Sequence, residues 1–192
     1  MGQYDPLIHH RRSIRLKGYD YSQPGLYFIT ICVQQRKCLF GNIHHEKMHL
    51  NQPGKMVEKW YWELENKFPN IKCHQMIVMP NHFHCIIQAT PVGADLCVCP
   101  PPQHQQTDLA EQPDVLGEHV GSAIPTVVQW FKTMSTNEYI RGVKLQNWPR
   151  FDGKLWQRNY YEHIIRDENA FRNISNYIVN NPVKWNGDKF YL

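Results

Sequence analysis

Two adjacent strand-like runs constrain the fold of this chain more than any other feature. The segments "IKCHQMIVMP" and "HFHCIIQA" are rich in apolar and β-branched residues, and the short connection Pro80–Asn81 separates them. A connection this short makes the two runs neighbours. The sequence therefore predicts a β-hairpin near the middle of the chain.

The flanking segments predict a further strand and several helices. "LYFITICVQQ" is typical of a strand, and "FGNIHHEKMHLNQPG" is typical of a connection with one short strand around residues 43–50. Apolar residues at helical spacing predict helices over residues 55–68 and over "SAIPTVVQWFKTMSTNEYI", where Ser122 is a candidate cap. "KLWQRNYYEHII" has strand-like and turn-like features. A last helix is expected from Asp167 until Pro182 stops it.

The order strand, helix, strand, strand, helix, strand predicts an α+β fold, with a mainly antiparallel sheet and helices packed on one face. A chain of 192 residues can bury one sizeable core, so we expect a single domain over residues 1–192. Residues 1–24 form a basic N-terminal segment within it. Residues 90–121 are rich in Pro, Gln and acidic residues without periodicity, which predicts a loop insertion.

Composition argues against membrane and secreted classes of protein. No stretch approaches the roughly 20 apolar residues of a membrane helix, and the N-terminus lacks the apolar core of a signal peptide. We therefore expect a soluble, cytoplasmic protein whose six cysteines are reduced. One residue separates Cys97 from Cys99, whereas about two to four residues separate the paired cysteines of structural zinc sites. The pair is therefore a weak candidate for a zinc site.

Positive charge is concentrated at the two ends of the chain. The net charge is +4, yet no Lys or Arg occurs from Cys73 to Phe131. In the last third of the chain, cationic residues alternate with aromatic rings, a combination that suits the phosphates and bases of nucleic acid. A solvated surface above a few core aromatics explains the same composition equally well. Charge alone leaves both interpretations open.

The histidines at the start of the second hairpin strand are candidate metal ligands. Side chains at positions i and i+2 of a strand share a face, so His82 and His84 project together while Phe83 packs on the other side. Neutral imidazole binds divalent metals, and two such ligands leave coordination positions for a substrate. Two polar residues on the open face of a sheet need no metal, so spacing alone does not decide.

The last predicted helix carries a second candidate pair. Tyr177 and Asn181 stand four residues apart, which brings their polar ends to one face of the helix. The alternative is that Tyr177 packs on the sheet and Asn181 only ends the helix before Pro182.

In this order, the motifs resemble the single-tyrosine HUH transposases, above all the tyrosine transposases associated with repetitive extragenic palindromes (REP) in the IS200-like superfamily. "VMPNHFHCII" resembles their histidine strand, "WQRNYYEHIIR" the segment before their last helix, and "YIVNNPVKW" the end of their tyrosine helix. With "GLYFITICVQQRKCLFG" and the helix near "VQWFKT", the resemblance extends from about Arg11 to Trp185. It implies the ferredoxin-like, RRM-like fold of HUH nucleases.

The resemblance also implies a mechanism. His82, His84 and Asn181 would hold a divalent metal, Mg²⁺ or Mn²⁺, that polarises the scissile phosphate of single-stranded DNA. Tyr177 would attack the phosphorus, which gives a 5′-phosphotyrosine link and a free 3′ hydroxyl that can return to join strands. A phenol with a pKa near ~10 needs activation by the metal or a base for this step. No nucleotide cofactor is implied.

The family's substrate is a palindromic hairpin, which implies that part of the chain binds single-stranded and hairpin DNA. The candidates for this role are Arg11, Arg12, Arg15, Lys17, Arg158, Tyr160 and Tyr161. The two tyrosines are also rivals for the nucleophile, but they lack a carboxamide at helical spacing. Glu162 and His163 are candidate helpers, and Gln157 is a candidate to face the site.

Two other functions stay open from the sequence. One is a nucleic-acid-binding module that has kept the fold without cutting DNA. The other is a metal-dependent hydrolase that uses the histidine pair and a water nucleophile, for which Tyr177 is dispensable. Monomer and homodimer are both compatible with the sequence, and a DNA-processing role implies a cytoplasmic, nucleoid-associated location.

Overall fold

The computed structural model describes residues 23–91 and 124–187, and four of its strands form one antiparallel sheet. These strands are β1 (Gly25–Cys32), β4 (Ile71–Met79), β5 (His82–Ala89) and β6 (Tyr161–Ile165), in the spatial order β4-β5-β1-β6. Because β5 lies between β1 and β4, the chain forms a split βαβ unit of the ferredoxin-like type. The predicted hairpin around residues 80–81 is confirmed.

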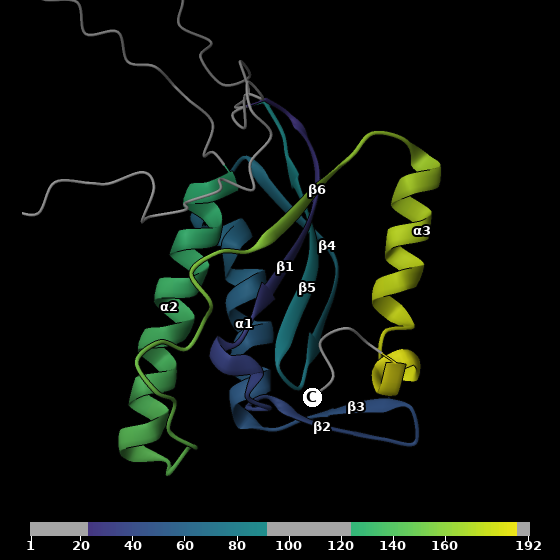
Figure 1. The fold of residues 1–192 in the computed structure, drawn as a ribbon. Helices are drawn as coiled ribbons and strands as arrows, with labels where there is room; N and C mark the ends of the chain where they lie inside the picture. The colour runs from purple at the N-terminus through teal and green to yellow at the C-terminus, as the bar shows by residue number, and fades with distance from the viewer. Residues whose placement is uncertain (1–22, 92–123, 188–192) are drawn as a thin grey trace, which may run out of the picture.

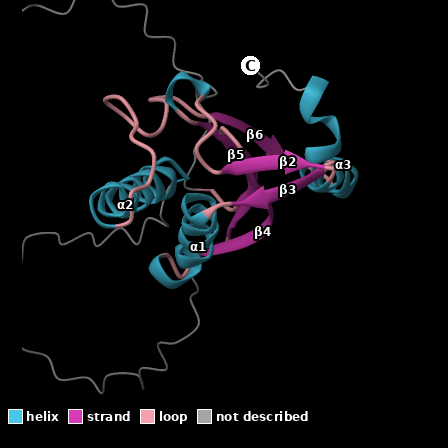
Figure 2. Ribbon diagram, turned by 90° about the horizontal axis from the view of Figure 1, so that it is seen from below, coloured by secondary structure: helices cyan, strands magenta, loops and turns pink. Residues whose placement is uncertain are grey.

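The helices cover both faces of this sheet. α1 (Gln52–Lys67) and α2 (Ile124–Leu145) lie side by side on one face, and α3 (Glu168–Val179) lies on the other (Figure 1). The view along the strands shows the same three layers (Figure 2). Short 3₁₀ helices, η1 (Gln34–Arg36) and η2 (Pro182–Gly187), follow β1 and α3.

The predicted α+β class is confirmed, but the helices do not all lie on one face. The central strands β1 and β5 are apolar on both sides, since Phe28 and Ile86 point away from α1 and α2. A sheet that is apolar on both faces needs two covers. α3 supplies the second cover, with Ile178 wholly buried on the sheet and Ile174 packed beside it.

Local signals explain most element boundaries. The side-chain oxygen of Asn51 accepts a hydrogen bond from the Gly54 amide at 2.9 Å, so α1 begins three residues before the predicted Lys55. Asp167 caps α3 in the same way through the Ala170 amide at 2.8 Å, which confirms the predicted start. α2 runs to Leu145, beyond the predicted end, and its candidate cap Ser122 lies outside the described residues.

The segment predicted to hold one short strand forms a separate two-stranded hairpin. β2 (Gly41–His44) pairs with β3 (Lys47–Leu50). His45 and Glu46 have φ values of 48° and 61°, so the chain reverses within two residues. The basic segment 1–24 and the predicted insertion 90–121 lie almost wholly outside the described residues.

The core between the sheet and α1 and α2 is the larger of two apolar clusters. Phe83 of β5 stacks on Phe131 of α2 with ring centroids 5.2 Å apart, and the Tyr61 hydroxyl donates to the Ile86 carbonyl at 2.7 Å.

Cys38, Cys73 and Cys85 are free thiols, as predicted, whereas Cys97 and Cys99 lie outside the described residues. Within the described ranges, every helix is too short or too polar to cross a bilayer.

Candidate active site

Polar side chains interrupt the apolar face beneath α3 where β1 ends and β5 begins. The strand register pairs Thr30 with His84 and Cys32 with His82. The Thr30 hydroxyl lies 2.7 Å from Nδ1 of His84, and the two residues are 3% and 1% exposed. A hydrogen bond at Nδ1 fixes the plane of the imidazole ring and leaves Nε2 for other chemistry.

His82 is oriented by the residue that precedes it. Its Nδ1 lies 2.8 Å from the side-chain oxygen of Asn81, and both residues are buried. Because a carboxamide oxygen only accepts, Nδ1 of His82 donates here and the ring lone pair is at Nε2. The two histidine rings are 4.5 Å apart between centroids, and Trp185 of η2 stacks on His82 at 6.0 Å.

α3 brings the predicted tyrosine to His84, one of the two histidines. The Tyr177 hydroxyl lies 3.4 Å from Nε2 of His84, and the ring packs edge-on against Phe28 at 6.0 Å. Asn181 follows the helix instead of lying within it, with its amide bonded to the Ile178 carbonyl at 3.2 Å. Tyr177 and Asn181 nevertheless line one cavity, as their spacing predicts.

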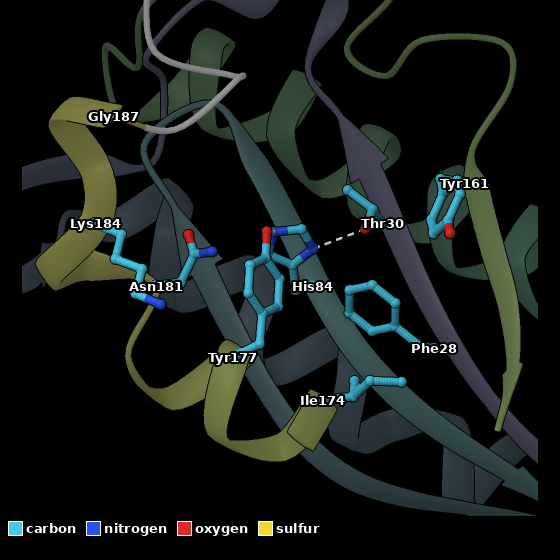
Figure 3. A pocket seen from close by; sticks show the side chains of 9 residues that line it. All are labelled: Phe28, Thr30, His84, Tyr161, Ile174, Tyr177, Asn181, Lys184 and Gly187. Atoms are coloured by element: carbon cyan, nitrogen blue, oxygen red, sulfur yellow. Dashed lines mark hydrogen bonds between the residues drawn. The ribbon is translucent and has the colours of Figure 1, made fainter. Parts of the chain in front are cut away.

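Asn181 is the least satisfied polar residue at this site. It is 0% exposed, and in the described part of the chain neither its side-chain oxygen nor its nitrogen has a hydrogen-bond partner. A buried carboxamide in this state costs about 1–3 kcal/mol, so such groups in native proteins usually serve a ligand. The side chain turns toward His84 and Tyr177 (Figure 3).

The cavity has a volume of about 480 Å³ and opens beside α3. Its walls combine apolar, aromatic and polar side chains (Figure 3), from Phe28, Thr30, His84, Tyr161, Ile174, Tyr177, Asn181, Lys184 and Gly187. Tyr161 is 53% exposed, so one face of its ring is open to a ligand. The ammonium of Lys184 forms no ion pair with a described carboxylate. A cation and a half-exposed ring in the walls of one cavity suit a nucleotide phosphate and its base.

The residues present suit a divalent cation. The described residues contain no group of three His, Cys, Asp or Glu side chains that fits a metal. The candidate donors are instead Nε2 of His82, Nε2 of His84, which contacts the Tyr177 hydroxyl, and the unsatisfied oxygen of Asn181. Such a set leaves coordination positions for the oxygens of a substrate.

Other predicted residues lie elsewhere. Arg11, Arg12, Arg15 and Lys17 are outside the described residues. Arg158 and Gln157 line a different cavity, and Tyr160 packs against the core on the α2 side of the sheet. Glu162 alternates with Tyr161 along β6, so its side chain also faces α2 and does not reach the candidate site.

Sequence reasoning missed several residues of the site, namely Phe28, Thr30, Asn81, Lys184 and Trp185. A signal existed for Thr30, because a polar residue inside "LYFITICV" breaks an apolar run. Its pairing with His84 depends on the register between β1 and β5, which the pattern of either strand alone does not reveal.

The fold and the site together define a ferredoxin-like α+β protein in which one of two neighbouring buried histidines on the sheet faces a tyrosine on a covering helix. A protein of Haemophilus influenzae described as "Uncharacterized protein" is 38% identical over 193 residues, or 99% of this chain and 98% of the relative. The chain belongs to the family of that protein.

A second Haemophilus influenzae protein, named "Putative REP-associated tyrosine transposase", is 24% identical over 168 residues, or 86% of this chain and 74% of the relative. The predicted resemblance to REP-associated tyrosine transposases is thereby confirmed. The solved structure "Structure of the REP associates tyrosine transposase bound to a REP hairpin" matches with a TM-score of 0.49 and 19% identity, over 96% of this chain and 74% of that chain. No protein-family model matches the chain.

Proposed function

We propose that this protein nicks single-stranded DNA and transfers strands through a 5′-phosphotyrosine at Tyr177, with hairpin DNA as substrate. The observation that carries the proposal is the position of the Tyr177 hydroxyl, 3.4 Å from Nε2 of a buried histidine and in the same cavity as Asn181. A phenol needs activation to attack a phosphodiester, and this position offers it. The name of the second relative supports a transposase, and the hairpin substrate rests on the motif resemblance.

His82, His84 and Asn181 are the residues that would hold Mg²⁺ or Mn²⁺. When bound, the cation would polarise the scissile phosphate and make the neighbouring phenol more acidic. Asn81 and Thr30 contact the Nδ1 atoms of the two rings. Nε2 of each imidazole is therefore the atom that would bind the cation.

The remaining wall of the cavity positions the DNA strand. Lys184 is the candidate contact for a phosphate oxygen, because its ammonium has no carboxylate partner among the described residues. Tyr161 is the candidate stacking surface for a base, a role that the packed ring of Tyr160 suits less well. Tyr177 then forms a bond to phosphorus as the bond to the 3′ oxygen breaks. The link stores the energy needed for the 3′ hydroxyl to rejoin the strands.

The test is a denaturing gel of the protein incubated with Mn²⁺ and a panel of labelled hairpin oligonucleotides. We expect a covalent protein-DNA band for the wild type and none for Tyr177→Phe. Tyr161→Phe is the matched control, because it removes a hydroxyl from the same cavity and should keep the band.

The alternatives give different results in this assay. Cleavage without an adduct, unchanged in Tyr177→Phe, would indicate a hydrolase with a water nucleophile. Binding of hairpins without cleavage would indicate a non-cleaving nucleic-acid-binding module. An adduct lost only in Tyr161→Phe would transfer the nucleophile role to Tyr161.

A further inference from the structure

A second cavity lies on the α2 side of the sheet, whereas the candidate active site lies on the α3 side. It has a volume of about 400 Å³ and runs between α2 and the segment 153–158; we call it the α2 groove. Lys154 and Arg158 form one wall, opposite Gln129 and Asn137 of α2, and all four are exposed. Among the described residues, no carboxylate lines this groove.

Lys132 adds a third cation beneath the groove. Its Nζ donates to the backbone carbonyls of Gln157 at 3.0 Å and Arg158 at 3.3 Å, and lies 5.3 Å from the centroid of the Tyr160 ring. These contacts hold the segment against α2. In the described part of the chain, Lys132, Lys154 and Arg158 form no ion pair.

No ion pair among the described residues neutralises the charge of the groove. The nearest acid along the chain is Asp152, which pairs with Lys37 at 2.5 Å. Three cations without carboxylate partners in a concave site attract an anion. The carboxamide of Asn137 makes no hydrogen bond with a described residue, so its N–H groups are available to the oxygens of that anion.

The groove and the candidate active site are joined by a short stretch of chain. The segment that forms the groove continues into β6, where Tyr161 lines the active-site cavity (Figure 1). β6 is an edge strand, so no further strand of the described sheet stands between the two cavities. The short stretch from Arg158 of the groove to Tyr161 of the active-site cavity therefore leads from one cavity to the other along this edge.

We propose that the α2 groove binds the phosphate backbone of the DNA that flanks the cleaved strand, an inference that rests on the proposed function. The ligand class is a phosphodiester, held by Lys154 and Arg158 and by the amide of Asn137. Contacts of this kind set the position of DNA and do not depend on its sequence. The groove would therefore add affinity for long flanking DNA without choosing the site of cleavage.

The experiment measures binding alone, in a Tyr177→Phe background without added metal and with EDTA. Fluorescence anisotropy with a fluorescein-labelled DNA hairpin of arbitrary sequence, extended by a single-stranded flank, gives the affinity at several salt concentrations. Lys154→Glu is compared with Lys144→Glu, which makes the same charge change at an exposed lysine of α2 outside the groove. We expect Lys154→Glu to weaken binding at least about fivefold and to lower the salt slope by about 1. Lys144→Glu should stay within about a factor of two, since it loses no phosphate contact.

A second variant separates charge from the loss of lysine. Asn137→Asp keeps the shape of the side chain and adds one negative charge inside the groove, so we expect it to weaken hairpin binding as well. Equal affinities for Lys154→Glu and Lys144→Glu would overturn the groove and leave the proposed function intact, because the covalent adduct is tested separately. The proposal would also be overturned if Lys154→Glu weakened the binding of polyglutamate and left the binding of DNA unchanged. That result would indicate an acidic protein partner.

Discussion

Replacement of Thr30 by valine tests whether the histidine pair is held for metal binding. Valine has nearly the shape of threonine and removes only the hydroxyl, so Nδ1 of His84 loses its partner at 2.7 Å. His84 is 1% exposed, so Nδ1 would be left as a buried polar atom. A buried polar atom left without a partner costs about 1–3 kcal/mol.

For a chain of this length, each kcal/mol lowers the melting temperature by about 2–4 °C, so we expect a fall of about 2–12 °C. Loss of the group that orients a ligating histidine lowers metal affinity by about 10- to 100-fold. Calorimetry of the metal-free protein measures the first effect. Titration with Mn²⁺ followed by electron paramagnetic resonance measures the second effect without any DNA.

Thr30→Ser is the matched control, because it keeps the hydroxyl and should restore most of the Mn²⁺ affinity. The reasoning would be refuted if Thr30→Val bound Mn²⁺ within about a factor of two of the wild type. Equal loss of affinity in Thr30→Ser and Thr30→Val would show that packing at this position matters and the hydrogen bond does not.

Three further predictions concern other parts of the structure. Asn181→Leu removes an unsatisfied buried carboxamide, so the metal-free protein should be as stable as the wild type or slightly more stable. The same change should weaken Mn²⁺ binding by about 10-fold or more. A large loss of stability in calorimetry would contradict the first expectation. Burial lowers the pKa of Lys132 from 10.5 to about 8, so the unfolded chain binds more protons between those pH values and stability should rise with pH across that window. Urea denaturation should show this rise, up to about 3 kcal/mol, in the wild type and not in Lys132→Met. Phe83→Ala should cost about 3–5 kcal/mol in the same assay, because Phe83 is 1% exposed between α1 and α2; a cost under about 1 kcal/mol would mean that the ring is not part of a packed core.

The identity of most elements could be predicted from local patterns. Apolar, β-branched runs indicated the hairpin strands, helical spacing indicated α1 and α2, and Asp167 and Pro182 indicated the start and end of α3. These signals are local because a hydrogen-bonded turn or a capped first turn depends on residues within a few positions of each other. Spacing placed His82 with His84 and Tyr177 with Asn181 on shared faces, and the resemblance to the HUH transposases made the two pairs candidates for one site.

The contacts that could make these residues reactive depend on tertiary structure. The partner of His84 is Thr30, more than fifty positions earlier, and the register of β1 on β5 sets that pairing. The placement of α3 depended on the second apolar face of the sheet. That face can be recognised only when it is known which strands are central. By itself, the sequence determined which residues are candidates for catalysis and which elements carry them. The tertiary structure decided that they meet, because register and helix docking are set by packing between distant segments, where no local pattern distinguishes one arrangement from another.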